Sequence, residues 1–176
     1  MTARGETIAK LVLVGFVTFF VLFFSTPRGQ FKTLALGDIA PNFTLRNEEG
    51  KVVALADFRG KIVVLNYWAT WCPPCIEEMP SLNRLADRFR DKDLVVLGVS
   101  LDEDADAYKD FLAKNQISFL TLRNPARAVS EQYGTYKLPE TFVISRQGRL
   151  LKKYIGPKEW DGAEIAAEFN AFLAAP

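Results

Sequence analysis

The stretch NYWATWCPPCIEEMP, residues 66–80, contains both cysteines of this 176-residue chain, Cys72 and Cys75. It overlaps the end of a continuous apolar run, KIVVLNYW at 61–68, of the kind that forms a strand buried on both faces of a sheet. Further along, apolar residues recur with helical spacing at Met79, Leu82, Leu85, Ala86 and Phe89. The cysteines are therefore predicted to lie where a buried strand is followed by a helix.

A thiol at that junction is well placed for redox chemistry. Cys72 would lie near the helix N-terminus, where the positive end of the helix dipole favours a thiolate over a thiol. The two-residue spacing brings the sulfur of Cys75 within reach, so that a mixed disulfide formed at Cys72 can be resolved within the chain. The alternative is a fixed disulfide that staples the fold, although a loop this short restricts the unfolded chain little.

Composition excludes several other uses of the two thiols. The chain has no histidine and cannot supply the four nitrogen and sulfur ligands of a structural zinc site. Cys75 is followed by Ile76, where covalent haem attachment requires a histidine. With 22 Lys and Arg against 21 Asp and Glu, the net charge of +1 attracts neither nucleic acid nor an anionic membrane. We therefore expect no metal, no other cofactor and no nucleic-acid partner.

The N-terminus carries a second apolar run, Leu11–Phe24. Extended to Thr7–Thr26 it has 20 residues, the length that spans a bilayer core as a helix. A cleaved signal peptide and a buried core helix are the alternatives, but the nearest small-x-small triplet, a candidate cleavage site, lies only at residues 35–37. The expected organisation is a membrane anchor or signal segment at 1–26, a linker at 27–37 and one domain, facing the periplasm or another extracytoplasmic space, at 38–176.

Beyond residue 37, strand and helix patterns alternate as in one α/β domain with a mixed sheet. A hairpin is predicted from Phe43–Leu45 and Val52–Leu55, which flank the turn sequence RNEEGK. Leu94–Leu101 is a second buried strand, closed by Asp102 and Asp104, which can cap the next helix. The remaining elements are a short helix at 126–133, the strand-forming sequence GTYKLPETFVI at 134–144, a strand at 149–155 and a C-terminal helix that buries Ile165 and Phe169.

Three motifs in order resemble the thioredoxin superfamily: NYWATWCPPC, then Glu78-Met79-Pro80, and later Pro139 before an apolar strand. Within it the chain is most similar to the TlpA/ResA-like membrane-anchored thiol-disulfide oxidoreductases, including the reductases of cytochrome c maturation. The resemblance extends from about residue 37 to the C-terminus. It implies a thioredoxin fold, a central mixed sheet flanked by helices, with an N-terminal hairpin and a strand-helix insert within Leu94–Leu122.

The resemblance also implies roles for individual residues. Cys72 is expected to be the nucleophile and Cys75 the resolving thiol, and Pro139 corresponds to the family's cis-proline beside the disulfide. Thioredoxins carry a buried aspartate six residues before the first cysteine, but this chain has Asn66, which cannot titrate. Glu78, a near-surface helix acid three residues after Cys75, is expected to assist proton transfer instead. The alternative is an ordinary acid stabilised by the helix dipole.

Two further residues are expected at the substrate surface. Trp71 would form an apolar wall beside Cys72. Glu140, directly after Pro139, resembles the PET sequence of the cytochrome c maturation reductases and would contact the partner in a groove; the alternative is an ordinary charge at a strand end. The other aromatic residues singled out are expected in the core: Trp68, Tyr133 and Trp160.

The sequence favours a reductant. Neither Pro73 nor Pro74 has an N–H group to stabilise a Cys72 thiolate, and nearby acids disfavour it, which makes the disulfide a poor oxidant. The resemblance implies disulfide-bearing extracytoplasmic substrates, such as apocytochrome c, and a membrane thiol-disulfide electron donor. The alternatives are a reductant of copper-site proteins, a non-enzymatic copper carrier that uses both thiolates, and a peroxiredoxin-type peroxidase, although the position of Thr70 and the second cysteine do not fit that group.

Overall fold

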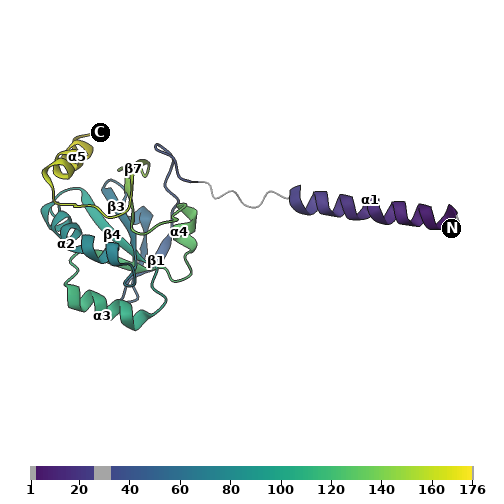
Figure 1. Ribbon diagram of the computed structural model, residues 1–176. Coiled ribbons are helices and arrows are strands. Elements are labelled where there is room, and N and C mark those ends of the chain that lie inside the picture. Colours follow the sequence, from purple (N-terminus) through teal and green to yellow (C-terminus); the bar gives the residue numbers. More distant parts are fainter. Residues whose placement is uncertain (1–2, 26–32, 176) are drawn as a thin grey trace. The chain divides into compact units, whose positions relative to one another are not determined.

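The structure, a computed structural model, describes residues 3–25 and 33–175. The chain divides into two compact units, 1–31 and 32–176, and helix α1 (Ala3–Ser25) lies in the first (Figure 1). Residues 1, 2 and 26 of the expected anchor and residues 27–32 of the expected linker lie outside the described residues. Within the described parts of the chain, no helix is long and apolar enough to cross a membrane.

The second unit alternates strands and helices, as predicted for an α/β domain (Figure 1). Its elements are β1 (Thr44–Arg46), β2 (Val52–Ala54), the short 3-10 helix η1 (Leu55–Phe58), β3 (Ile62–Trp68), α2 (Pro73–Arg88), β4 (Leu94–Ser100), α3 (Ala105–Asn115), β5 (Leu120–Arg123), α4 (Ala128–Gln132), β6 (Glu140–Ile144), β7 (Leu150–Ile155) and α5 (Ala163–Ala174). Helix α4 is shorter than predicted because Arg127 has a φ of 58°, a left-handed conformation that cannot continue a right-handed helix.

Five strands form one mixed sheet in the order β5-β4-β3-β6-β7. Strands β3, β4 and β5 are parallel, whereas β6 and β7 run antiparallel to their neighbours. All seven residues of the central strand β3 are buried, which confirms the prediction from its continuous apolar run. Strand β5 extends the sheet beyond β4, and together with helix α3, which precedes it, corresponds to the expected strand-helix insert. The central mixed sheet flanked by helices is the fold class predicted from the sequence.

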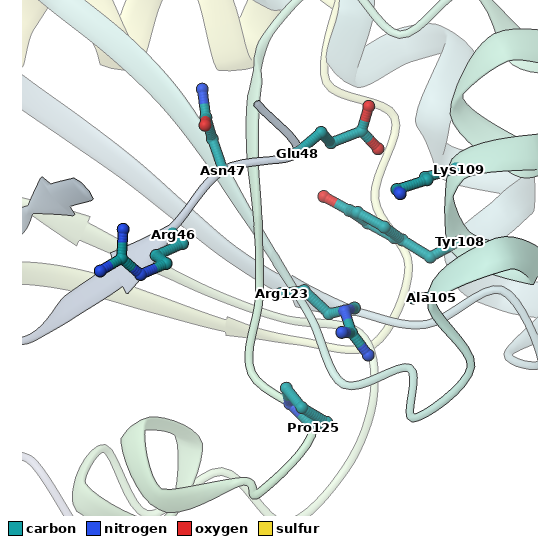
Figure 2. A pocket seen from close by; sticks show the side chains of 8 residues that line it. All are labelled: Arg46, Asn47, Glu48, Ala105, Tyr108, Lys109, Arg123 and Pro125. Carbon is teal, nitrogen blue, oxygen red and sulfur yellow. The ribbon is translucent and has the colours of Figure 1, made fainter. Parts of the chain in front are cut away.

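The predicted N-terminal hairpin is present as the antiparallel pair β1 and β2. Its turn is closed by Asn47, whose side-chain oxygen accepts the N–H of Lys51 at 2.8 Å, and by Gly50, which adopts a φ of +78° that favours glycine. The turn lies beside Tyr108 and Lys109 of α3, with which it lines a pocket (Figure 2). The hairpin therefore borders the insert at the β5 edge of the sheet.

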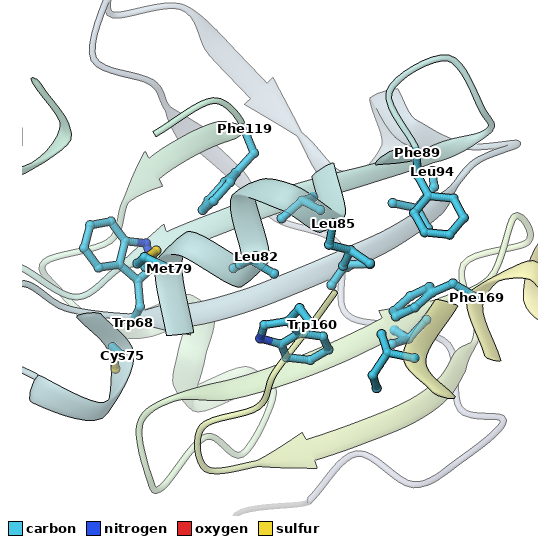
Figure 3. Packing of buried hydrophobic residues seen from close by; sticks show 14 of the residues in the cluster. Trp68, Cys75, Met79, Leu82, Leu85, Phe89, Leu94, Phe119, Trp160 and Phe169 are labelled. Atoms are coloured by element: carbon cyan, nitrogen blue, oxygen red, sulfur yellow. The ribbon is translucent and has the colours of Figure 1, made fainter. Parts of the chain in front are cut away.

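The side chains of β3 alternate between two cores, as the period of a strand requires. Ile62, Val64 and Trp68 pack on the face covered by α2 and α5. Figure 3 shows that core, where Met79, Leu82 and Leu85 of α2 lie between Trp68 and Phe169. Val63, Leu65 and Tyr67 pack on the opposite face, against the hairpin and α4. The three aromatic residues expected in the core are completely buried: Trp68, Tyr133 and Trp160.

Candidate active site

Cys72 and Cys75 are joined by a disulfide at the start of α2, with their Cα atoms 5.3 Å apart. Cys72 precedes the first helical residue, and Pro73 and Pro74 occupy the first two positions of the helix. The next two amides, of Cys75 and Ile76, donate to the carbonyl oxygen of Cys72 at 3.0 and 3.2 Å. Among the described residues, none donates a capping hydrogen bond to the Cys72 side chain. These two amides therefore bond to a backbone carbonyl oxygen and not to the sulfur of Cys72.

The two sulfurs differ in accessibility. The residue Cys72 is 6% exposed and Cys75 is completely buried. Trp71, directly before Cys72, is 56% exposed and lies with its ring 5.9 Å from the guanidinium of Arg127. Trp71 therefore presents an aromatic surface next to the more accessible cysteine.

The loop that leads to Cys72 is held by the buried carboxylate of Asp102. The N–H of Thr70 donates to both carboxylate oxygens of Asp102 at 3.1 and 3.0 Å, and the Thr70 hydroxyl donates to Oδ1 at 2.6 Å. The hydroxyl of Ser100 donates to Oδ2 at 2.6 Å. The prediction that Asp102 caps the next helix is wrong, because Asp104 alone accepts the first amides of α3. Asp102 is instead a support of the active-site loop.

Glu78 is buried, with 2% of its surface exposed, and not near the surface as expected. Three donors from two other segments converge on its carboxylate. Asn66 Nδ2 of β3 donates to Oε1 at 2.8 Å. The indole Nε1 of Trp160 and the backbone N–H of Lys158, both in the segment before α5, donate to Oε2 at 3.1 and 3.0 Å. Asn66 reaches Glu78 because residues 62, 64, 66 and 68 of β3 share the face that packs on α2.

Burial raises the pKa of Glu78 to about 7, and the hydrogen bonds from Asn66, Trp160 and Lys158 oppose that rise. The carboxyl group is therefore poised to gain or lose a proton near neutral pH. A cleft of ≈ 270 Å3, which Glu78 itself lines together with Glu77 and Glu159, gives the group a route to solvent. This environment is compatible with proton transfer, and the burial of Glu78 differs from that of a solvated acid in the first turns of a helix.

The Leu138–Pro139 peptide is cis, as expected for the family's proline. Strand β6 begins with the next residue, and its register pairs Glu140 with Tyr67 of β3. In an antiparallel pair the residue before Glu140 therefore faces the end of β3, from which the cysteine loop leaves. Pro139 is thus on the same edge of the sheet as the disulfide.

Glu140 is completely buried, so the expectation of a carboxylate exposed to a partner in a groove does not describe this structure. Its Oε2 lies 3.3 Å from the ammonium of Lys153, which extends from the neighbouring strand β7. Burial raises the pKa of Glu140, and the nearby positive charge of Lys153 opposes the rise. The alternative interpretation of Glu140, an ordinary charge at a strand end, does not describe it either, because its carboxylate forms a buried ion pair with Lys153.

The sequence did not identify Lys158 and Trp160 as parts of the site. Their contacts with Glu78 span 80 and 82 residues of sequence, and no local pattern indicates them. The prediction that Trp160 is a core residue is correct, because its ring is completely buried. The prediction did not include the hydrogen bond that its indole N–H donates to Glu78. The one available signal was Asn66, since an amide at a position where thioredoxins have a titrating aspartate indicates that another group takes the proton.

Comparisons with known proteins agree with this geometry. The sequence model of the family described as the AhpC/TSA family matches residues 36–153, a range that contains both cysteines and Pro139. The chain is 33% identical over 154 residues to the thiol-disulfide oxidoreductase ResA of Bacillus thuringiensis subsp. konkukian. This match covers 86% of each protein. It is 32% identical over 125 residues to ResA of Bacillus subtilis, covering 71% of this chain and 70% of that protein.

A solved structure is similar as well. The crystal structure of a protein assigned as thiol:disulfide interchange protein DsbE from Chlorobium tepidum superposes with a TM-score of 0.76 at 32% sequence identity. The match covers 81% of this chain and the whole of that one.

Proposed function

This chain belongs to the AhpC/TSA family and is a ResA-like thiol-disulfide oxidoreductase, and from that premise we propose that it acts as a reductant of disulfides in extracytoplasmic proteins. The observation that carries the direction is the helix N-terminus at Cys72. Pro73 and Pro74 have no N–H to offer, and the amides of Cys75 and Ile76 are bonded to a carbonyl. A thiolate without these donors is less stabilised, which favours the oxidised form of the pair and makes the dithiol a good reductant.

In the proposed reaction, the Cys72 thiolate attacks one sulfur of the substrate disulfide. The substrate S–S bond breaks, the second substrate sulfur leaves as a thiolate and is protonated, and a mixed disulfide links the two proteins. Cys75 then loses its proton and attacks the Cys72 sulfur, which releases the first substrate sulfur as a thiol. Two electrons have passed to the substrate, and the protein is left with the Cys72–Cys75 disulfide that the structure contains.

Glu78 is the proposed acceptor of the Cys75 proton. The two residues are three positions apart on α2 and so lie on the same side of the helix. A buried thiol such as that of Cys75 resists ionisation, because burial disfavours the charged form. A carboxyl group with a pKa of about 7 can take the proton at neutral pH and return it to solvent through the cleft beside Glu159.

The N-terminal segment is proposed to hold the domain at the outer face of a membrane. In support, the side chains of residues 11–25 of α1 are exposed, and those from Leu11 to Phe24 are almost all apolar. A helical stretch that is apolar on every side is typical of a segment buried in a protein core or in a membrane. The proposed electron donor is a membrane thiol-disulfide transporter, because a dithiol in an oxidising compartment stays reduced only with a continuous supply of electrons.

The proposed substrates are disulfides of proteins such as apocytochrome c, and the second candidates are copper-site proteins whose thiols have been oxidised to a disulfide. Trp71 beside Cys72, and the 72% exposed Tyr136 shortly before Pro139, would supply aromatic contacts to such a partner. A non-enzymatic copper carrier is the alternative of a different class. It would hold cuprous ion tightly between the two sulfurs of the reduced pair.

A trapping experiment tests the proposal. In cells that carry the full chain with Cys75→Ser, Cys72 should accumulate in mixed disulfides with its substrates, which can be isolated and identified. Cys72→Ser is the matched control and should trap nothing. Reduced wild-type protein should also reduce the insulin disulfides. A chain that traps no partner, leaves insulin unreduced and binds one cuprous ion tightly would be a carrier and not a reductase.

A further inference from the structure

A pocket of ≈ 230 Å3 lies outside the dithiol site, between the β1–β2 hairpin and α3 (Figure 2). The hairpin contributes Arg46 and Glu48, helix α3 contributes Tyr108 and Lys109, and Arg123 stands at the end of β5. Figure 2 shows Lys109 and Arg123 on either side of the Tyr108 ring, with Arg46 at the opposite rim. These residues are called the basic pocket below.

The basic pocket has an excess of positive charge. Arg46, Lys109 and Arg123 line it, against the single carboxylate of Glu48. Arg46 donates to the carbonyl oxygen of Gly50 at 2.7 Å, and Arg123 donates to that of Glu103 at 2.8 Å. Within the residues that the structure describes, none of the three cations forms an ion pair with a carboxylate. Figure 2 shows the carboxylate of Glu48 on the Lys109 side of the pocket, so an excess of two positive charges remains for an anionic group from outside.

The register of the sheet places this pocket on the edge that carries the disulfide. Trp68 of β3 pairs with Ser100 of β4, and Ser100 pairs with Arg123 of β5. Neighbouring strands are about 4.8 Å apart, so Arg123 lies roughly 10 Å from the end of β3, which leads to Cys72. Both sites are at the carboxyl ends of parallel strands, the edge where ligands bind in open α/β sheets. Asp102 connects them, because it holds Thr70 with its carboxylate while its carbonyl oxygen accepts from Arg123 at 3.4 Å.

We propose that the basic pocket is a substrate subsite, which binds an Asp or Glu side chain of the disulfide-bearing protein. The inference rests on the proposed function, since it requires a polypeptide substrate at Cys72. An extended chain advances about 3.3 Å per residue, so a span of roughly 10–15 Å puts the acidic residue about three to five positions from the cysteine that Cys72 attacks. The subsite selects among protein disulfides by the charge of their flanking sequence.

The test uses the full chain in its reduced form and synthetic peptides. Each peptide has one cysteine as a mixed disulfide with a coloured aromatic thiol, which leaves when Cys72 attacks the peptide sulfur. A single Glu is moved through the first six positions on either side of the cysteine, and a Gln peptide is the reference at each position. Second-order rate constants should be about two- to five-fold higher for Glu at positions three to five, the size expected of an exposed ion pair. High salt should remove that advantage.

Variants of α3 identify the group responsible. Lys109→Gln should lower the preference for Glu at positions three to five, and Lys109→Glu should lower it further. Lys114→Gln is the matched control, because Lys114 is on the same helix, where its ammonium lies 3.7 Å from the carboxylate of Asp110. Equal rates for Glu and Gln peptides, or a preference that is undiminished in both Lys109→Gln and Lys109→Glu, would overturn the subsite alone. A protein that attacks none of the peptides would reject the proposed function and the subsite with it.

Discussion

Asn66 Nδ2 donates a hydrogen bond of 2.8 Å to Glu78 Oε1, and so joins the central strand β3 to helix α2 inside the core. The same amide group donates to Thr141 Oγ1 of β6 at 2.9 Å. The residue at the position of the buried aspartate of thioredoxins thus holds the titrating group in place without titrating itself. This contact fixes the carboxyl group of α2 against the central strand of the sheet.

The first prediction concerns the ionisation of Glu78 in the oxidised protein. Its folded pKa of about 7 lies above the ordinary value of 4.5, so the folded state binds the proton more tightly than the unfolded state. The contribution of Glu78 to stability is therefore complete below pH 4.5 and is lost as the pH rises through 7. The total loss is on the order of 3 kcal/mol, since one pKa unit corresponds to about 1.4 kcal/mol.

Glu78→Gln should remove this dependence, because the amide keeps the shape of the side chain but does not titrate. Urea unfolding of the two proteins from pH 4 to pH 8 measures the difference. Wild type should lose stability relative to Glu78→Gln as the pH rises. Trp160→Phe is a second variant, which removes one donor to the carboxylate and should raise the pKa of Glu78 further. A difference between wild type and Glu78→Gln that is constant with pH contradicts the assignment.

The second prediction separates two neighbouring aspartates. Asp102→Ala removes the acceptor of the Thr70 N–H and hydroxyl, which should destabilise the protein by about 1–3 kcal/mol and slow disulfide exchange at Cys72, because the loop that positions the sulfur is released. Asp104→Ala removes a helix cap and should cost about 1 kcal/mol without changing the exchange rate. Stopped-flow exchange with a small aromatic disulfide provides the rates. If both variants slow exchange equally, Asp102 has no specific role at the active site.

The third prediction concerns the buried ion pair of Glu140 and Lys153. Lys153→Met leaves a carboxylate without its cation in the interior, which should cost about 3 kcal/mol at pH 8. The loss should be smaller at pH 5 than at pH 8, because burial raises the pKa of Glu140 and removal of the cation raises it further, so that a lower pH eases protonation of the carboxyl group. The double variant Glu140→Gln with Lys153→Met should regain most of the stability. Equal losses at the two pH values, by urea unfolding, would contradict this account.

Local patterns predicted the parts of the fold that depend on neighbouring residues. The run of apolar residues at 61–68 predicted the buried strand β3, and the turn sequence around Asn47 and Gly50 predicted the hairpin. The placement of the cysteines between β3 and α2 followed from the same strand and helix signals. These features could be predicted because their causes lie within a few positions of one another in the sequence.

Features that depend on distant partners could not be predicted in this way. Glu78 was expected near the surface because the donors that allow its burial, Trp160 and the Lys158 amide, come from the other end of the domain. Glu140 was expected to face a partner because its cation, Lys153, belongs to another strand. Burial of a charge becomes predictable only when the tertiary neighbours that compensate it are known.

The fourth prediction concerns the order in which the thiols react. In the reduced protein, Cys72 should be alkylated first by iodoacetamide, because it is the more exposed cysteine and precedes the helix N-terminus, whereas Cys75 is completely buried. Peptide mapping by mass spectrometry after brief labelling identifies the modified residue. Faster labelling of Cys75 would reverse the proposed roles of nucleophile and resolving thiol.

The reduction potential of the Cys72–Cys75 pair tests the direction of electron flow most directly. It can be measured by equilibrating the protein with glutathione or dithiothreitol buffers and separating the two forms after alkylation. The first amides of α2 donate to a carbonyl oxygen and not to the sulfur. The reduction potential should therefore be closer to that of thioredoxin, about −270 mV, than to that of a dedicated oxidant, about −120 mV. That gap is worth about 7 kcal/mol for two electrons and is easily resolved. A potential above about −160 mV would contradict the account and identify a disulfide-forming enzyme.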